Sequence, residues 1–517
     1  MAAINHRNPR VSSDRLGWLT ILLFGFAGIA SGLVASLGSP ILAFIIVALF
    51  AAVVLIASPL VLLWVVLIGG LVLSGVAELY FPSLGQARWG VALAAIALGA
   101  ASLVFGMWAH RPIPATPTRA WSSIATWSLL FLLIALFSAF LNLGLSFDTV
   151  VGLKGYFQVW GILLAFVLLP LRAPSVERTM MFLFWLGLIQ LPFILHQHFV
   201  LVPQRSGIAD AARGMVAQDI LVGTFSGSMS GGGAGPAMAV LLLIALTIAI
   251  AMWRVGKISF IKLALASIAF FLPLAIGEHK IALVLLPVGL FVVFDDKVRR
   301  NPLGAIGLAT ISGVLLAVLF IVFTLLPRAG STRLLTPDEY WNEMWSYNAG
   351  ERGYGNYALN RTTVYPFWAK YHQTAGGSVI QTLVGHGPGS SKDARGGLSE
   401  HSLAAERFPG YGIGLTGISG LLWDTGVLGT LAVLGLLVSA YRTVRNLLLQ
   451  TPTGSVRWAN LKGAQAGIAM IGFSFLHNNM FLYEIGFQTM TMLLLGYVAY
   501  VERTLAPPFA GRKGASA

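Results

Sequence analysis

Long apolar stretches recur along almost the whole chain, and polar residues gather in short segments between them. About 20 consecutive apolar residues form a helix long enough to cross the hydrocarbon core of a bilayer. Fourteen spans are therefore predicted, at about residues 16–37, 41–57, 60–80, 90–109, 120–142, 151–171, 182–201, 236–253, 258–276, 281–294, 302–326, 415–440, 464–481 and 485–501. The turns near residues 38–40 and 58–59 are so short that this region could instead contain fewer, tilted helices.

One long polar segment interrupts this pattern at residues 328–414. It divides the chain into an N-terminal transmembrane region at 1–327, the large loop itself, and a C-terminal transmembrane region at 415–517. The loop contains many aromatic residues and several helix signals, so we expect it to be ordered and partly helical. The predicted fold is an all-α, polytopic bundle of 12–14 spans with one large loop.

The first helix signal in the loop is Thr336-Pro337-Asp338-Glu339, the pattern of a capping box with proline at the first helical position. Aromatic and apolar residues follow it at Tyr340, Trp341, Met344, Trp345 and Tyr347. They predict an amphipathic helix that lies either at the membrane surface or against the rest of the loop.

The composition agrees with a membrane protein. Of 517 residues, 57% are hydrophobic and 10% are charged, whereas soluble domains have about 25% charged residues. The chain has no cysteine, which excludes disulfides and thiolate metal sites. No small-residue cleavage site follows the first apolar run, so we expect that run to be a span and not a cleaved signal.

The basic charge of the chain has a topological explanation. A net charge of +14 and a pI near 10.1 could indicate nucleic-acid binding. With the N-terminus in the cytoplasm and the spans alternating, however, 20 of the 33 basic residues and five of the 19 acidic ones lie inside. Cytoplasmic segments of membrane proteins carry such an excess of Lys and Arg. We therefore expect cytoplasmic termini, residues 328–414 on the outer face, and no nucleic-acid partner.

The same topology gathers histidines on the outer face. Histidine has the side-chain pKa closest to neutrality, so this clustering favours proton transfer or polar ligand binding there. The outer histidines are His196, His198, His279, His372, His386, His401 and His477. Beside His279, Lys280 lies between two apolar spans, where it could bind phosphate or simply extend its ammonium group to the interface.

Further candidate chemistry lies in the large loop. Arg361 precedes a helix expected to begin near Thr363, and the segment Gly385-His386-Gly387-Pro388-Gly389 could bring backbone amides to an anion or be a plain turn. A third helix is expected from Ser399, with His401 in its first turn. The helix dipole favours a neutral imidazole there, while Glu400 and Glu406 favour the charged form.

Several of these segments together resemble the O-antigen ligase and O-antigen polymerase superfamily of bacterial surface polysaccharide assembly. Over about residues 200–440, the similar pieces occur in the order of that family. They are Gly223-Thr224-Phe225 before an apolar span, His279-Lys280 at a span start, Asn360-Arg361 with Trp368, the glycine-rich segment 383–389, His401 with Leu403, and Asp424-Thr425-Gly426-Val427-Leu428-Gly429. Lysine replaces the usual arginine at position 280.

The resemblance implies a GT-C-like membrane glycosyltransferase in the bacterial inner membrane, working on its periplasmic face. The donor would be a glycan on undecaprenyl pyrophosphate, and the acceptor a lipid-linked glycan or a lipid A core. Neither metal nor cofactor is expected, and a chain-length regulator or other assembly proteins are candidate partners. Inversion at the anomeric carbon is also an expectation of the resemblance.

The demands of this chemistry assign roles to individual residues. Arg361 and Lys280 would stabilise the leaving pyrophosphate, with Arg213 or Arg205 as a third cation. His401 would act as general base, with His386 as its rival. His279 and Asp424 are further candidates. The pair Asp295-Asp296, which a metal-dependent reaction might use, is expected in a solvated cytoplasmic turn beside Lys297, Arg299 and Arg300.

Three functions remain open at this point. A polymerase that joins lipid-linked repeat units is favoured, because aromatic side chains of the large loop suit a long sugar chain. A ligase that moves finished glycan to a lipid A core would use the same chemistry. A transporter or flippase of lipid-linked glycan is the third, although such proteins usually bind their substrate near the bilayer midplane on broken helices.

Overall fold

The computed structural model describes residues 58–81, 87–109, 122–144, 146–209, 217–230, 232–325, 336–354, 357–372, 378–392 and 404–505. Within these ranges every regular element is a helix, and the one β pairing is an isolated bridge between Gly227 and Gly233. The all-α prediction is confirmed for this part of the chain. The chain divides into two units, Met1–Val65 and Val66–Ala517, and the first is described only from residue 58. The spans predicted at 16–37 and 41–57 lie outside the described residues.

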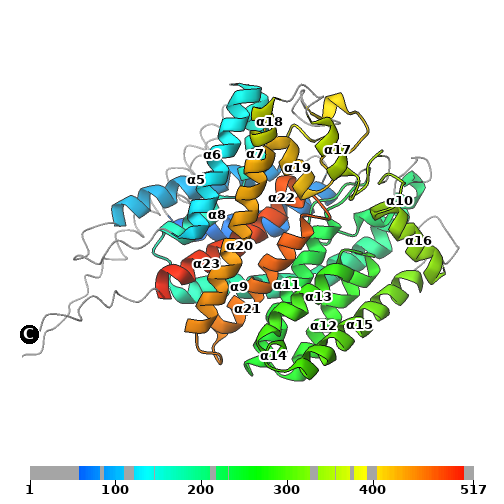
Figure 1. The fold of residues 1–517 in the computed structure, drawn as a ribbon. Coiled ribbons are helices and arrows are strands. Elements are labelled where there is room, and N and C mark those ends of the chain that lie inside the picture. The colour runs from blue at the N-terminus through cyan, green and yellow to red at the C-terminus, as the bar shows by residue number, and fades with distance from the viewer. Residues whose placement is uncertain are drawn as a thin grey trace, which may run out of the picture. The chain divides into compact units, whose positions relative to one another are not determined.

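The helices follow one another along the chain as labelled in Figure 1. Before the large loop they are α3 (Pro59–Ile68), the π-helical turn η1 (Gly69–Leu73), α4 (Ser74–Tyr80), α5 (Ala87–Ala109), α6 (Ser123–Leu143), α7 (Phe147–Phe157), α8 (Gly161–Leu168), α9 (Ala173–His196), the π-helical turn η3 (Gln197–Leu201), α10 (Val202–Ala209), the 3-10 turn η4 (Ala217–Ile220), α11 (Gly235–Arg254), α12 (Phe260–Ile276), α13 (Ala282–Val293), α14 (Asp295–Val298) and α15 (Pro302–Leu325). The loop contains α16 (Pro337–Asn348), α17 (Val364–Tyr371), α18 (Val379–Val384) and the 3-10 turn η5 (Ala405–Arg407). After the loop come α19 (Gly417–Asp424), α20 (Gly426–Gln450), α21 (Val456–Ser474), α22 (Met480–Tyr483) and α23 (Ile485–Leu505).

Seven helices of the described residues are long and apolar enough to cross a membrane, and the bent pair α7 and α8 would make eight. A multi-pass, helical membrane protein is the architecture that these helices indicate. The number of qualifying spans is smaller than predicted. With a rise of 1.5 Å per residue, the 17 residues of α12 and the 12 of α13 extend about 26 and 18 Å, less than the ~30 Å hydrocarbon core. Helices α21 and α23 contain buried polar residues such as Asn460 and Gln488, which lower their hydropathy.

Four of the predicted spans have clearly different boundaries in the structure. The span predicted at 182–201 is a helical stretch from Ala173 to Arg205. The span predicted at 151–171 is broken into α7 and α8, which meet at 54°. The span predicted at 415–440 is two helices, because the backbone leaves helical geometry at Thr425 and Gly426, where Gly426 has a φ of +66°. The span predicted at 464–481 begins earlier, at Val456, and ends at Ser474.

The capping signals in the loop are confirmed. Thr336 and Glu339 form the predicted capping box, and α16 begins at Pro337. Part of its aromatic face packs on α15, and a place at the membrane surface stays a prediction. Tyr340 is buried against Phe320 and Phe323 of α15, while Trp341 and Trp345 stack on each other and are more than half exposed. The predicted second helix is α17, with Thr363 at its N-cap position.

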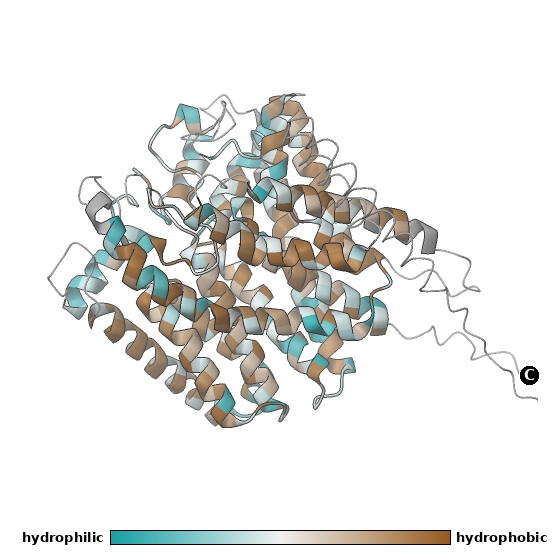
Figure 2. Cartoon of the chain, turned by 180° about the vertical axis from the view of Figure 1, so that it is seen from behind, coloured by the Kyte–Doolittle hydropathy of each residue, from teal (hydrophilic) through white to brown (hydrophobic). Residues whose placement is uncertain are grey.

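The core of the bundle is α11, which is almost entirely buried and contacts α9, α12, α13, α21 and α23. Small residues allow close approach at such helix contacts. At the crossing of α5 and α8, a β-carbon on Gly161 would lie only 1.8 Å from the carbonyl oxygen of Ala95. Figure 2 shows that the helices are apolar along most of their length, with hydrophilic residues mainly near their ends and in the connections.

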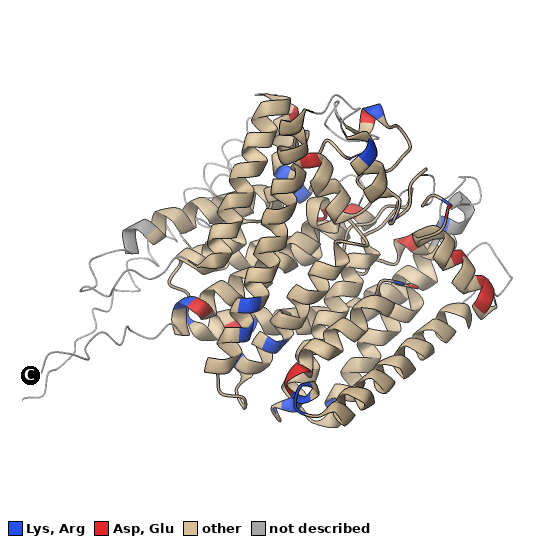
Figure 3. Cartoon of the chain, viewed as in Figure 1, with Lys and Arg blue, Asp and Glu red and all other residues tan. Residues whose placement is uncertain are grey.

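Charged residues expected in the cytoplasm contact one another although they are far apart in sequence. Arg254 pairs with Asp296 at 2.7 Å, Lys462 pairs with Asp295, and Arg457 pairs with Glu177 at 3.0 Å. In Figure 3, charged residues gather near helix ends in the lower part of the view. Asp295 and Asp296 lie on the short helix α14. Asp296 is partly exposed, as expected, but the closest cations of the pair are Arg254 and Lys462 and not its sequence neighbours.

Candidate functional site

Arg361 is held where three separate segments meet, just before α17. Its Nε donates to the carbonyl oxygen of His477 at 2.7 Å, and one terminal nitrogen donates to the Asn348 side chain at the end of α16. Its guanidinium also lies over the ring of Tyr354, 4.1 Å from the centroid. The side chain is only partly buried. Arg361 is therefore positioned by its contacts while part of it remains accessible.

Lys280 lies on the short connection between α12 and α13 and approaches the same region. Its Nζ is 5.1 Å from the centroid of the Tyr340 ring on α16. Burial lowers the pKa of the His477 imidazole well below its usual value, and the positive charges of Arg361 and Lys280 lower it further. Lys280 and Arg361 therefore both lie within electrostatic range of the His477 imidazole, and its burial and their charges favour its neutral form.

Arg205 joins this group through Asp219. The Arg205 side chain is buried and donates to the carbonyl oxygen of Ser228 at 3.1 Å. Burial raises the pKa of the Asp219 carboxyl, and the positive charges of Arg205 and Lys280 oppose that rise. Asp219 therefore lies within electrostatic range of both. We call Arg205, Asp219, Lys280, Arg361 and His477 the primary cation cluster.

The backbone at Glu278 is strained beside this cluster. Glu278 has a φ of +47°, the only positive φ of a non-glycine residue within the described ranges. Such conformations are costly and concentrate at functional sites. The strained turn directs His279 inward, against Gly235 and Gly277, where any β-carbon would clash with its ring. Burial lowers the pKa of His279 to about 4, so this candidate is a neutral packing residue in the structure.

The glycine-rich turn does bind an anion, and that anion belongs to the protein. The Asp424 carboxylate accepts hydrogen bonds from the amides of Gly389 at 2.8 Å and Ser391 at 2.7 Å. It also accepts hydroxyl bonds from Ser390, Tyr156 and Tyr483 at 2.8–3.0 Å. Gly385, Gly387 and Gly389 all have positive φ, as such a concave backbone requires. Asp424 is therefore an internal anchor, and its five donors are used within the protein.

His386 is packed in the same turn. Its ring is 5% exposed and lies 5.8 Å from that of Trp423, whose carbonyl oxygen accepts from the His386 amide. Burial lowers the pKa of the His386 imidazole to about 4, and the charges of Arg407 and His372 contribute. A buried neutral imidazole of this kind has little access to an acceptor hydroxyl, which weakens it as the rival base.

The segment Gly223-Thr224-Phe225 is buried between helices and not a flexible linker. The Gln190 side chain accepts from the Thr224 amide at 2.9 Å and donates to its hydroxyl at 3.0 Å. The Gln197 side chain likewise accepts from the Gly223 amide and donates to its carbonyl. Two glutamines of one helical stretch thus fix a backbone segment that connects to both Arg205 and the interior of the bundle.

A second group of cations was missed by the sequence analysis. Lys154 on α7 lies over the ring of Trp89, at 4.5 Å, and the charges of Arg88, Lys392 and Glu78 act on it. Lys392, which follows the glycine-rich turn, lies 5.1 Å from the ring of Tyr483. We call Arg88, Lys154 and Lys392 the second cation cluster. The available signal was Lys154 itself, since an ionisable residue inside an apolar span usually has a function.

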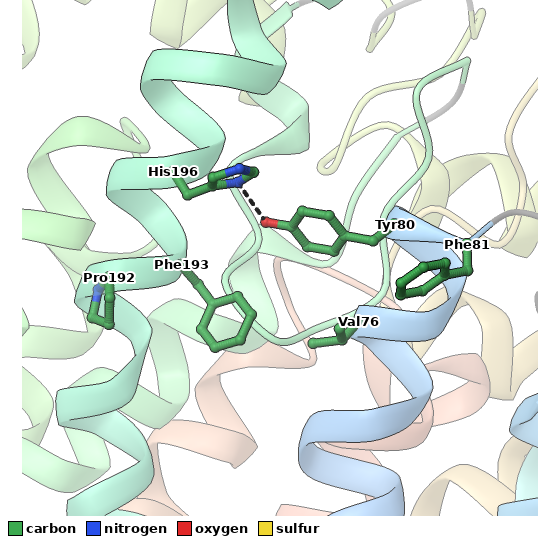
Figure 4. A pocket seen from close by; sticks show the side chains of 6 residues that line it. All are labelled: Val76, Tyr80, Phe81, Pro192, Phe193 and His196. Atoms are coloured by element: carbon green, nitrogen blue, oxygen red, sulfur yellow. Dashed lines mark hydrogen bonds between the residues drawn. The ribbon is translucent and has the colours of Figure 1, made fainter.

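An apolar groove lies between α4 and α9. It has a volume of about 360 Å³ and is lined by Val76, Tyr80, Phe81, Pro192, Phe193 and His196. Figure 4 shows its one polar contact among these residues, between the Tyr80 hydroxyl and His196 Nδ1 at 3.1 Å. The groove helix α9 continues through η3 into α10, which carries Arg205. The groove and Arg205 thus lie on the same continuous helical stretch, nine residues apart at the closest.

Two predicted site residues lie outside the described ranges, namely His401 and Arg213. The helix expected from Ser399 also begins there, and the described part of that region is the short turn η5. No group of three or more His, Asp or Glu residues that could hold a metal occurs within the described part of the chain. Of the predicted site residues, Arg205, Lys280 and Arg361 belong to the primary cation cluster, whereas His279 and His386 are buried by packing and Asp424 anchors the glycine-rich turn.

No protein-family model matches this chain, and no curated protein matches its sequence.

Proposed function

We propose that this protein is a membrane glycosyltransferase that moves a glycan from a polyprenyl pyrophosphate donor to a sugar hydroxyl. One observation carries the proposal: Lys280 lies within electrostatic range of Asp219, as does Arg205, and also of His477, whose carbonyl oxygen accepts a hydrogen bond from Arg361. Cations brought together in this way suit a ligand with several negative charges. The proposed GT-C-like bundle has residues 328–414 on the periplasmic face of a bacterial inner membrane.

The transfer step follows from these groups. The bond between the anomeric carbon and the pyrophosphate oxygen breaks, and a bond to the acceptor oxygen forms. The acceptor proton passes to a base, and polyprenyl pyrophosphate leaves with the electron pair of the broken bond. Fixed cations stabilise the charge that develops on that leaving group. His401 is the proposed base, on the sequence alone.

The apolar groove supports a lipid-linked donor. Its lining of Val76, Phe81 and Phe193 suits an isoprenoid chain, while the Tyr80 and His196 pair marks a polar point within it. A donor chain in the groove would extend along the helical stretch that leads to Arg205. Joining of repeat units is the favoured reaction, and transfer to a lipid A core is the alternative with the same chemistry.

The test is transfer in vitro by purified full-length protein with a synthetic polyprenyl-pyrophosphate oligosaccharide. Arg361→Ala is expected to lower turnover about 100-fold or more, as removal of a transition-state donor does. Arg361→Lys should retain part of the activity, since lysine keeps the charge and loses the planar fork. Arg352→Ala is the matched control, because Arg352 also lies over a tyrosine ring but is exposed. Full turnover in Arg361→Ala would refute the proposal.

Translocation of a lipid-linked glycan is a second candidate, favoured by the 54° break between α7 and α8 beside Lys154. Broken helices with polar groups are typical of transporter binding sites. Vesicles separate the two functions: movement of labelled donor across the bilayer without any longer product would support translocation. Longer lipid-linked product would support polymerisation, and product on lipid A core would support ligation.

A further inference from the structure

The second cation cluster lies where three segments pack closely. A β-carbon on Gly152 of α7 would lie 2.0 Å from the carbonyl oxygen of Pro388, so α7 rests directly on the glycine-rich turn. Lys154 follows Gly152 by two residues, and Lys392 follows Pro388 by four. Tyr156 and Tyr483 meet edge to face at 6.2 Å and both donate to Asp424. Lys154 and Lys392 thus lie on two segments that touch at Gly152 and Pro388. Arg88 is the chain neighbour of Trp89, whose ring lies against Lys154.

Nearby carboxylates do not balance this charge. Asp424 already accepts five hydrogen bonds from the protein. Glu484 is buried and accepts from the amide of Phe487 and the hydroxyl of Ser226 at 3.2 Å. Glu78 is the carboxylate whose charge acts on both lysines. Three cations facing one such carboxylate leave a positive site, and a lysine on an apolar span is costly unless it has a use.

One short segment contacts a residue near each cation cluster. In the partly buried segment that follows Phe225, the Ser226 hydroxyl donates to Glu484, and the Ser228 carbonyl accepts from Arg205. Two residues of chain extend at most about 7 Å. The charge of Glu78 acts on Glu484 as well as on Lys154 and Lys392. The segment 226–228 therefore contacts Arg205 of the primary cluster and Glu484, which lies within electrostatic range of the same Glu78 as Lys154 and Lys392.

We propose that Arg88, Lys154 and Lys392 form a second phosphate site, which holds the phosphate of the acceptor glycolipid beside the donor site. The identity of the donor site in this inference rests on the proposed function. The existence of the second phosphate site does not depend on that function. A transfer reaction needs donor and acceptor held close together, and two phosphate sites along one short segment provide that. The acceptor is then a phosphorylated, lipid-linked glycan, which is the chemistry of a growing chain on its own carrier.

Binding tests the site without any turnover. Full-length protein in nanodiscs is titrated with farnesyl phosphate by calorimetry, and two sites are expected. Lys392→Gln combined with Lys154→Gln should remove one site, and Arg361→Gln should remove the other. Lys392→Gln alone guards against misfolding, because Lys392 is an exposed residue on a turn. Lys370→Gln is the matched control, since Lys370 is exposed and lies 5.0 Å from a tyrosine ring. A single site in the wild-type protein, or loss of the same site in both variants, would overturn the proposal.

Kinetics then identify the occupant. With a fixed donor, Lys392→Gln and Arg88→Gln should raise the KM for a phosphorylated acceptor about tenfold, the effect of one lost charged hydrogen bond. The KM for the donor should stay unchanged. A glycan on an uncharged alkyl chain should be insensitive to both variants, and an equal effect on it would count against a phosphate site. Comparison of a prenyl pyrophosphate acceptor with a phosphorylated lipid A core shows which source is used. Two binding sites without any transfer would reject the proposed function and leave the phosphate site standing.

Discussion

Replacing Asp424 tests whether it is an internal anchor or a catalytic residue. Its two oxygens accept from two backbone amides and three hydroxyls, all at 2.7–3.0 Å, and the side chain is fully buried. Burial raises the pKa of the Asp424 carboxyl, while its hydrogen bonds lower it. In Asp424→Ala the hydroxyls can rotate, but the amides of Gly389 and Ser391 cannot turn to other acceptors.

The magnitude follows from these two amides. A buried donor left without a partner costs about 1–3 kcal/mol, so Asp424→Ala should lose about 2–6 kcal/mol of stability. In Asp424→Asn one oxygen remains, and the loss should be about half as large. Tyr483→Phe removes one donor and leaves the carboxylate with four, so it should cost about 1 kcal/mol.

The assay is thermal unfolding of the purified protein in detergent, followed by intrinsic fluorescence. The expected order of destabilisation is Asp424→Ala, then Asp424→Asn, then Tyr483→Phe. Turnover of Asp424→Asn per folded molecule should remain close to wild type below its unfolding transition. Equal stability of Asp424→Ala and Tyr483→Phe would refute the anchoring role, and loss of turnover in a fully folded Asp424→Asn would restore it as a catalytic candidate.

Three further predictions concern stability. Burial lowers the pKa of His386 from its usual 6.5 to about 4. Its contribution to the free energy of unfolding, about 3 kcal/mol, is therefore full above pH 6.5 and is lost as the pH falls toward 4. In His386→Phe the free energy of unfolding should fall less over this pH range. Burial raises the pKa of Glu484 to about 7. The contribution of Glu484 to the free energy of unfolding is therefore full below pH 4.5 and is lost as the pH rises through 7. The free energy of unfolding of Glu484→Gln, measured from pH 5 to 8, should not decline in this way. Thr336→Ala removes the cap of α16 and should cost about 1 kcal/mol there, seen as faster hydrogen exchange of the α16 amides with unchanged exchange in α11.

The positions of most helices could be predicted from the sequence because they depend on local patterns. Apolar runs of sufficient length predicted α6, α11 and α15 to within a few residues. The capping box at Thr336 and the start of α17 near Thr363 were read in the same way. These features depend on side chains a few residues apart, so the chain itself carries the necessary information.

Helix breaks depend on partners that the local pattern does not contain. The break after Asp424 brings that carboxylate to the turn at 385–391, some 35 residues earlier in the chain. The polar faces of α21 and α23 are compatible with burial because Lys462 meets Asp295 and Gln488 meets the carbonyl of Gly155. Hydropathy alone treats such residues as interruptions, since it contains no information about what lies opposite them.

The sequence by itself determined which side of the bundle each charged segment should occupy and which cations were worth testing. Only the tertiary structure decided that Lys280 comes within electrostatic range of both Asp219 and His477, that the glycine-rich turn already holds Asp424, and that Arg88 and Lys392 come within electrostatic range of Lys154. The physical reason is range. Helix formation and membrane insertion depend on neighbouring residues, whereas an anion site needs charges that only packing brings together. A hydrogen-bond donor can bind an external anion only where no group of the protein already accepts from it.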